Sequence, residues 1–235
     1  MSKATIPEIR ARFDADVERF SNLNTGQVST VDATLCLDLI TESAARLVPH
    51  AQNLLDIGCG AGNYTLMMLA KLPGLSCTLL DLSRPMLDRA AERVAAVAHQ
   101  SPVTVQDDIR TAPLPENHFD IILAGTVLHH LRDDADWEQV FAKLYRLLKP
   151  GGCLLISDLV AQETDALTDA MWLRYAAYLE NLGGKPYAEN VLAYIDREDS
   201  PRAVTYQLDL LRRVGFRTVE LLHKHLCFAA FGGQK

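Results

Sequence analysis

Residues 53–62 read Asn-Leu-Leu-Asp-Ile-Gly-Cys-Gly-Ala-Gly and decide the fold of this 235-residue chain. Leu54, Leu55 and Ile57 form an apolar run that is short enough for a fully buried strand. The three glycines that follow let the backbone turn sharply and lie against a ligand where a Cβ atom would clash. Residues 63–72 continue with helical spacing, so the ligand would meet the N–H groups of a helix N-terminus. The stretch therefore predicts a strand, turn and helix that hold a nucleotide-like cofactor.

Acidic residues further along the chain strengthen this prediction. Asp56 lies inside the buried strand, where a dinucleotide-binding turn carries an apolar residue, and a buried carboxylate needs a partner. Asp81 ends the next apolar run, at a place where a carboxylate can accept from both hydroxyls of a ribose. Asp108 and Ile109 follow the strand-like residues 103–106, in position to contact an adenine through its amino group and its face.

After the glycine turn, the sequence alternates strands and helices. Pro73 with Gly74 ends the first helix, Ser83 caps the second, and residues 119–124 form the fourth strand. This βαβα repetition predicts a single α/β domain over residues 1–235, with a doubly wound, Rossmann-like, mostly parallel sheet and helices on both faces. Ligands of such sheets bind beyond the carboxyl ends of the strands.

Two segments lie outside this alternation. Residues 6–20 carry an apolar stripe at helical spacing, and Ser29 with Asp32 approximates a capping box for a further helix. We expect residues 1–48 to form an N-terminal helical lid. Residues 159–200 are rich in aromatic side chains, and we expect them to form a cap insertion that closes the acceptor pocket together with the lid.

Composition narrows the class of function. Hydrophobic residues make up 49% of the chain and no apolar run approaches the roughly 18 residues that a membrane span needs. The N-terminus lacks an apolar signal core, so we expect a cytoplasmic protein. A net charge of −7 argues against a large nucleic-acid-binding surface and favours a small-molecule substrate. The five cysteines show no Cys-x-x-Cys spacing, which predicts reduced, buried thiols.

Taken together, the motifs between Leu54 and Asp158 resemble those of class I S-adenosylmethionine-dependent methyltransferases. The set comprises Asp-Ile-Gly-Cys-Gly-Ala-Gly, the acid at position 81, the Asp-Ile pair at 108–109 and Leu-Lys-Pro-Gly-Gly at 148–152. The resemblance implies a seven-stranded sheet whose last strand pairs antiparallel between strands five and six. It also implies S-adenosylmethionine as donor and S-adenosylhomocysteine as product. The donor-binding residues that it indicates are Gln27, Asp56, Gly58, Cys59, Gly60, Gly62, Asp81, Leu82, Asp108, Ile109 and Ala124.

Within these enzymes, the chain is similar to the branch of carboxy-S-adenosylmethionine synthase, which serves tRNA modification. Gly26-Gln27 stands where that branch has a Gly-Tyr pair, and residues 210–216 match its C-terminal helix. An apolar residue, Leu210, occupies the place of the arginine that would hold the extra carboxylate, although Arg212 and Arg213 are close. We therefore expect ordinary methyl transfer to an oxygen, nitrogen or sulfur of a small molecule.

The resemblance implies that the Leu-His-His segment at 128–130, after the fourth strand, lies beside the donor, and His129 is the expected catalytic side chain. If the methyl acceptor must lose a proton, a histidine is the side chain best suited to take it near neutral pH. A histidine hydrogen-bonded within the fold is an equally good interpretation. In the cap insertion, Tyr175 and Tyr178 are candidates for contact with the substrate or, through cation–π contacts, with the sulfonium; plain packing is the alternative.

No metal site is predicted. Adjacent residues such as His129 and His130 are expected to point apart. His223, His225 and Cys227 share a strand face by alternation, a spacing that packing explains more simply than a metal does.

Two other functions remain open from the sequence. The acid at position 81 lies close to the spacing of a dinucleotide fingerprint, as in a nicotinamide-dependent oxidoreductase. The chain could also be a non-catalytic cofactor-binding module. Its surplus of apolar surface outside the alternating core further predicts a homodimer.

Overall fold

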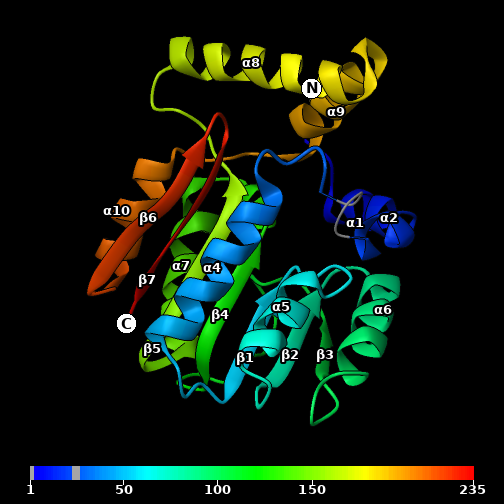
Figure 1. Ribbon diagram of the computed structural model, residues 1–235. Coiled ribbons are helices and arrows are strands. Elements are labelled where there is room, and N and C mark those ends of the chain that lie inside the picture. Colours follow the sequence, from blue (N-terminus) through cyan, green and yellow to red (C-terminus); the bar gives the residue numbers. More distant parts are fainter. Residues whose placement is uncertain (1–2, 23–26) are drawn as a thin grey trace.

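The computed structural model describes residues 3–22 and 27–235 and has a seven-stranded sheet at its centre (Figure 1). The strand order is β3-β2-β1-β4-β5-β7-β6. Their bounds are β1 Asn53–Ile57, β2 Ser76–Asp81, β3 Val103–Gln106, β4 Phe119–Gly125, β5 Leu148–Leu159, β6 Thr218–His225 and β7 Phe228–Gln234.

The strand directions confirm the predicted architecture. β1 pairs in parallel with β2 and β4, and β5 continues the parallel series beside β4. β7 is inserted between β5 and β6 and runs antiparallel to both. The chain therefore has the α/β, mostly parallel, seven-stranded sheet that the sequence predicts.

Helices cover both faces of the sheet because successive residues of a buried strand point to opposite faces. Leu54 packs into the cluster formed with α4 (Ala33–Leu47), α5 (Asn63–Lys71) and α6 (Arg84–Ala95). Leu55 packs into the opposite cluster, formed with α7 (Asp134–Leu147) and α10 (Val204–Val214). Both side chains are fully buried. All five cysteines are free and buried, as predicted.

The N-terminal segment forms two helices, so the prediction of one helix over residues 6–20 is wrong. α1 spans Ile6–Asp14 and α2 spans Val17–Ser21. The break between them lets the rings of Phe13 and Phe20 approach to 5.6 Å between centroids. Seven residues of a continuous helix would separate them by roughly 10 Å along its axis.

The predicted capping box at Ser29 and Asp32 is also wrong. Asp32 precedes α4 with a φ of 55°, in the left-handed region, and its side chain makes no capping hydrogen bond. Its carboxylate instead accepts from His223 and His225 on β6. The Asp32 carboxylate therefore bonds to β6 rather than to the first N–H groups of α4.

The segment after β5 forms two helices, α8 (Asp165–Gly183) and α9 (Lys185–Glu198), which lie over the carboxyl ends of the strands (Figure 1). α1 and α2 lie beside the same edge, next to α6. Both segments that the sequence places outside the alternating core thus border the edge where ligands of such sheets bind. Among the described residues, no helix is long and apolar enough to cross a membrane.

Candidate active site

A cavity of about 370 Å³ opens at the carboxyl ends of the parallel strands. Its lining comes from the glycine turn after β1, from the ends of β2, β3 and β4, and from α1, α2 and the end of α9. Ten of the predicted site residues line it: Gln27, Gly58, Cys59, Gly60, Asp81, Leu82, Asp108, Ile109, His129 and Tyr175. Gly26, named with Gln27, lies outside the described residues.

Four predicted site residues do not line this cavity. Asp56 points into the interior, where Thr65 Oγ1 donates to its carboxylate at 2.7 Å and burial raises its pKa to about 7. Gly62 packs against α6, and Ala124 is buried within β4. Tyr178 donates its hydroxyl to the carbonyl of residue 28, away from the cavity.

Two glycines of the turn serve different purposes. Gly58 has a φ of 61°, and a Cβ there would meet the side chain of Val127 at 2.5 Å. Gly60 has a φ of 51°, and no atom of residues 3–22 or 27–235 lies within 4 Å of the place where its Cβ would stand. Glycine at 58 therefore allows the turn to pack, and glycine at 60 leaves room for a ligand.

Asp81 is the acid best placed to bind the hydroxyls of a donor. Its Oδ2 accepts from the backbone N–H of Gly60 at 2.8 Å, and its Oδ1 accepts from that of Ser83 at 2.9 Å. Burial raises the pKa of this carboxyl, while these N–H groups lower it. Each oxygen keeps a further lone pair, so the carboxylate can accept from a ligand without losing its protein partners.

Asp108 is held by a neighbouring arginine. Arg110 donates from Nε at 2.9 Å to one oxygen and from a terminal nitrogen at 2.6 Å to the other, and it also pairs with Asp136. Burial raises the pKa of Asp108, but the contacts with Arg110 outweigh it and lower the pKa overall. The carboxylate stays ionised at the cavity wall, beside the buried Ile109.

His129 lies in the short 3₁₀ turn Leu128–His130, directly beyond β4. Its Nδ1 is hydrogen-bonded to Asp158, whose other oxygen accepts from the His129 backbone N–H at 3.1 Å. Burial alone would lower the pKa of this ring, but the carboxylates of Asp158 and Asp199 raise it to about 9. His129 is therefore a cation at neutral pH.

His130 has the opposite electrostatic state. Burial and the adjacent charge of His129 lower its pKa, so the ring is neutral at pH 7. Its Nδ1 lies 3.1 Å from Asp199 Oδ1, and its buried Nε2 has no hydrogen-bond partner among the described residues. The rings of His129 and His130 are 4.3 Å apart between centroids. The expectation that they point apart is wrong, because the 3₁₀ turn does not alternate side chains as a strand does.

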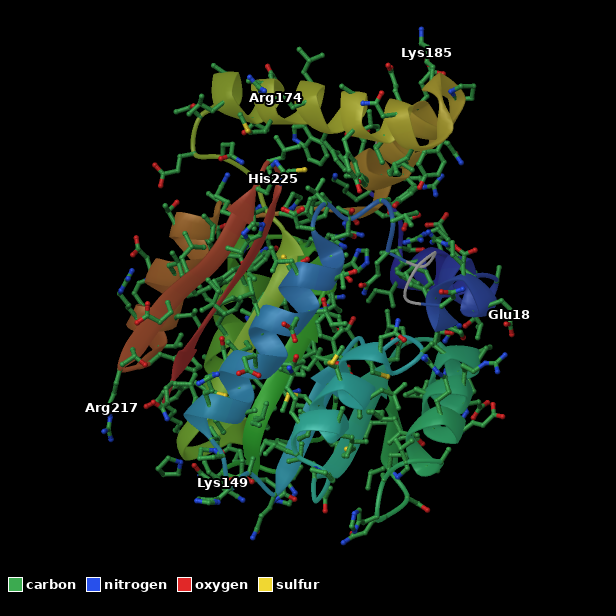
Figure 2. The ribbon with its side chains drawn as sticks, in the orientation of Figure 1. Glu18, Lys149, Arg174, Lys185, Arg217 and His225 are labelled. Carbon is green, nitrogen blue, oxygen red and sulfur yellow. The ribbon has the colours of Figure 1, made fainter. Side chains whose placement is uncertain are left out.

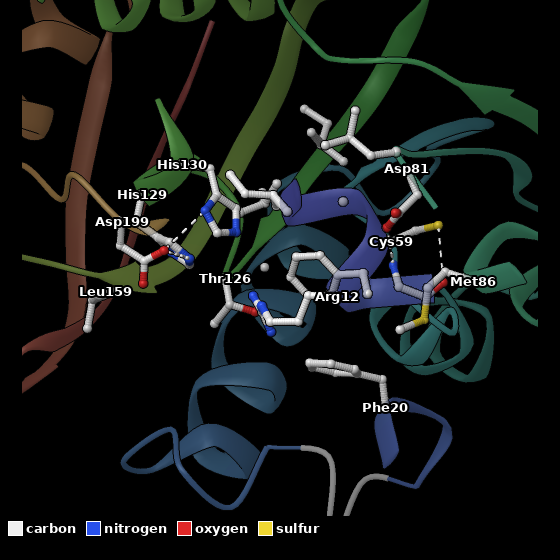
Figure 3. A pocket seen from close by; sticks show the side chains of 18 of the residues that line it. Arg12, Phe20, Cys59, Asp81, Met86, Thr126, His129, His130, Leu159 and Asp199 are labelled. Carbon is white, nitrogen blue, oxygen red and sulfur yellow. Dashed lines mark hydrogen bonds and ion pairs between the residues drawn. The ribbon is translucent and has the colours of Figure 1, made fainter. Parts of the chain in front are cut away.

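The wall beside this cluster comes from α1 and α2, and the ring of Phe13 lies 5.9 Å from that of His130 between centroids. The guanidinium of Arg12 lies 4.2 Å from the ring centroid of Phe13 and 4.9 Å from that of Tyr194, and it pairs with Glu198 at 2.7 Å. Figure 3 shows Arg12 between the histidine cluster on one side and Asp81 on the other. The cavity therefore joins an acidic, glycine-rich half to a half lined by aromatic rings and histidines.

Three charged residues in or next to the cavity are not predicted from the sequence: Arg12, Asp158 and Asp199. Asp158 stands near the end of β5, at the carboxyl edge of the sheet, and this position was a usable signal. Arg12 and Asp199 reach the cavity only through the packing of α1 and the end of α9, which no local pattern reveals.

Two groups of side chains among the described residues have ligand atoms close enough to hold a metal ion. They are the cluster of His129, His130 and Asp199, and a cluster of Asp32, His223 and His225 outside the cavity. In each, the ligand atoms lie within 4.8 Å of one another. Cys227, grouped with the strand histidines in the prediction, is buried and belongs to neither.

Comparison with known proteins agrees with this geometry. Residues 55–154 match the family model described as a methyltransferase domain. Demethylmenaquinone methyltransferase of Listeria monocytogenes serotype 4a is 27% identical over 179 residues, which cover 74% of each chain. Malonyl-[acyl-carrier protein] O-methyltransferase of Serratia marcescens is 36% identical over 119 residues, 51% of this chain and 43% of the relative. Both relatives are methyltransferases, and this chain is similar to them in sequence.

Solved methyltransferase structures share the fold. The 1,6-didemethyltoxoflavin-N1-methyltransferase of Burkholderia thailandensis, solved with its substrate and S-adenosylhomocysteine, has a TM-score of 0.66 at 18% identity. That likeness covers all of this chain and 92% of the other. An O-methyltransferase family protein of the same organism also has a TM-score of 0.66 at 18% identity, over 96% of this chain and 62% of the other. At this identity the likeness shows that the fold is shared and nothing more.

Proposed function

We propose that this methyltransferase binds S-adenosylmethionine along the glycine turn and transfers its methyl group to a small molecule held beside His129 and His130. The observation that carries the proposal is the single cavity that contains both sets of residues. Asp81 would accept from the ribose hydroxyls, and Asp108 with Ile109 would contact the adenine. Gly60 and Gln27 would border the amino-acid end of the donor.

We infer that His130 is the general base. The ring is neutral at pH 7, its buried Nε2 has no partner among the described residues, and the ring lines the cavity. On taking a proton from a hydroxyl or ammonium of the acceptor, it would become a cation beside the carboxylate of Asp199, 3.1 Å away. His129, already charged and fixed by Asp158, would position His130 and favour a negative charge that develops on the acceptor.

The lining of the acceptor half favours a small, partly aromatic or apolar molecule with an ionisable group. Phe13, Phe20 and Tyr194 supply flat apolar surface, whereas Arg12 offers a cation at the same wall. Methyl transfer from a sulfonium needs alignment of donor and nucleophile more than covalent help from the protein. A dry, aromatic chamber with one neutral base meets this requirement.

Ordinary methyl transfer is proposed over synthesis of a carboxylated donor. Leu210 is buried in the core. Arg212 pairs with Asp209 and Arg213 with Glu138, and neither arginine lines the cavity. The arginine that would hold an extra carboxylate therefore has no counterpart on α10. The free, buried cysteines support the proposal of a cytoplasmic location.

We also propose that α1, α2 and the cap close over the acceptor together. Ala4 donates its N–H to the carbonyl of Arg197 at 2.9 Å, and Arg132 donates to the carbonyl of Ala4 at 2.7 Å. The Arg12–Glu198 pair and the Ala4–Arg197 bond join α1 and the residues before it to the end of α9, and Arg132 holds Ala4 from the segment before α7. Closure would exclude water from the sulfonium and orient the nucleophile.

The experiment is a methyl-transfer assay over a panel of small phenols, hydroxy acids and amines, with release of S-adenosylhomocysteine as the readout. We expect His130→Gln to lower kcat about 10²- to 10⁴-fold, as loss of a general base does, with unchanged affinity for S-adenosylhomocysteine. Donor binding without turnover on any acceptor would favour the non-catalytic module. Saturable binding of a reduced nicotinamide cofactor, tighter than that of S-adenosylmethionine, would favour the oxidoreductase.

A further inference from the structure

The second cluster of potential metal ligands lies where the N-terminus of α4 meets the end of β6. Asp32 directly precedes α4, whereas His223 and His225 stand near the end of β6, the edge strand of the sheet. Figure 2 shows His225 at the end of β6 that faces α8. None of the three lines the active-site cavity, so the cluster is separate from the proposed donor and acceptor sites.

The two histidines converge on one oxygen. His223 Nε2 lies 2.9 Å and His225 Nδ1 lies 2.8 Å from the same atom, Asp32 Oδ2. The side chains of Asp32, His223 and His225 are 35%, 24% and 52% exposed, so a solvent ion can reach them. The side chains of residues 223 and 225 lie on the same face of β6, because successive side chains of a strand point to opposite faces.

The backbone at Asp32 is shaped for this convergence. A φ of 55° is uncommon for a residue other than glycine, and aspartate is one of the few that tolerate it. An aspartate at this position would ordinarily accept from the first N–H groups of the helix, but Asp32 makes no such bond. Its carboxylate is directed at the imidazoles instead.

We propose that Asp32, His223 and His225 bind a divalent transition-metal ion of the zinc class. Two imidazoles and a carboxylate are ligands that suit Zn²⁺, Ni²⁺ and Cu²⁺ rather than Mg²⁺ or Ca²⁺. In a tetrahedral site with metal–ligand bonds near 2.0–2.1 Å, ligand atoms are about 3.4 Å apart. The nitrogen–oxygen separations of 2.9 and 2.8 Å need to widen by only about half an ångström, which small side-chain rotations supply. The ion takes the place of the two N–H protons in these bonds, each imidazole then carries its proton on its other ring nitrogen, and water fills the fourth position.

The ion links β6 to the turn that precedes α4. Within that turn, Gln27 and Thr30 line the cavity. The turn is also held from the cap, since Tyr175 donates to the carbonyl of Ser29 at 2.7 Å and Tyr178 to that of Val28 at 2.8 Å. A metal at Asp32 would anchor the same turn from the opposite side, and so stabilise the folded state in proportion to its occupancy.

The test titrates the full-length protein, freed of metal with a chelator, with Zn²⁺ alone against a chromophoric competitor. We expect one equivalent to bind with a Kd in the micromolar range or below, and the melting temperature to rise with Zn²⁺. His223→Gln, His225→Gln and Asp32→Asn should each weaken binding by about 100-fold or more, because loss of a ligand exceeds the 10- to 100-fold cost of losing an outer partner. His99→Gln, at an exposed histidine on another face, should bind as the parent does.

Three results would overturn the assignment. The first is no binding at micromolar Zn²⁺, in which case the three side chains only form hydrogen bonds that hold β6 against the start of α4. The second is equal binding by the parent and by both histidine variants. The third is binding that His130→Gln removes and His223→Gln does not, which would move the ion to the active-site cluster. Weaker binding by Asp32→Asn cannot be attributed to misfolding, because asparagine also tolerates the left-handed backbone at this position.

Discussion

Replacing Asp158 by asparagine should return His129 to an ordinary histidine. Asp158 is 1% exposed and faces the ring directly, and its carboxylate is the foremost favourable contact of the His129 cation. Raising the pKa of His129 from 6.5 to about 9 corresponds to roughly 3 kcal/mol of preference for the charged ring in the folded state. In Asp158→Asn we expect the pKa of His129 to fall below 7, because burial then outweighs the remaining attraction of Asp199.

The sign of the pH dependence follows from the raised pKa. The folded state holds the proton more tightly than the unfolded state, so His129 stabilises the fold fully below pH 6.5 and this contribution is lost as pH rises through 9. Between pH 6 and 9.5, the free energy of unfolding of the parent should fall by about 3 kcal/mol more than that of Asp158→Asn. Asparagine also loses one backbone hydrogen bond, but that cost of about 1–3 kcal/mol is the same at every pH.

The assay combines urea unfolding at several pH values with an NMR titration of the histidine rings. Asp120→Asn is the matched control: it removes a partly buried carboxylate, paired with Lys149 and two backbone N–H groups, at the opposite end of β4. A His129 ring that titrates near 6.5 in the parent, or still near 9 in Asp158→Asn, would refute the reasoning.

Three further predictions concern the donor, the lid and assembly. Asp81→Asn should weaken S-adenosylhomocysteine binding roughly 10- to 100-fold, since it weakens hydrogen bonds to a charged acceptor worth about 1.5–3 kcal/mol; calorimetry that shows unchanged affinity counts against the ribose contact. Binding of S-adenosylhomocysteine should slow the hydrogen exchange of backbone N–H groups in residues 6–21 and 159–200 as well as in the glycine turn. Slower exchange in the turn alone would contradict the proposed lid. Leu167 and Leu173, 56% and 74% exposed on α8, support a homodimer; light scattering should give twice the chain mass, and a monomer mass at micromolar concentration contradicts it.

The fold could be predicted because its decisive signals are local. The apolar run at 54–57, the glycines after it and the alternation of strands and helices each follow from neighbouring residues. Ser83 accepts from the N–H of Met86, as its position before a helix predicts. Gly215, with a φ of 116°, ends α10, as glycine after a helix commonly does.

The catalytic half of the site could not be predicted in the same way. His130 was placed near the donor by its position after β4, but its neutral state depends on burial and on the charge of His129, which are tertiary properties. Asp199 comes from a segment about 70 residues further along the chain. Asp56 shows the converse: an acid inside a strand looked like a ligand contact, and its partner is Thr65 in the interior.

The central claim is that donor and acceptor share one cavity between Asp81 and the histidine cluster. A crystal structure with S-adenosylhomocysteine tests it most directly. We expect the ribose hydroxyls to lie on Asp81 and the adenine beside Ile109. The sulfur should point toward His130 and Asp199, with the acceptor half of the cavity beyond it. A ligand bound elsewhere, or one whose sulfur points away from the two histidines, would contradict it.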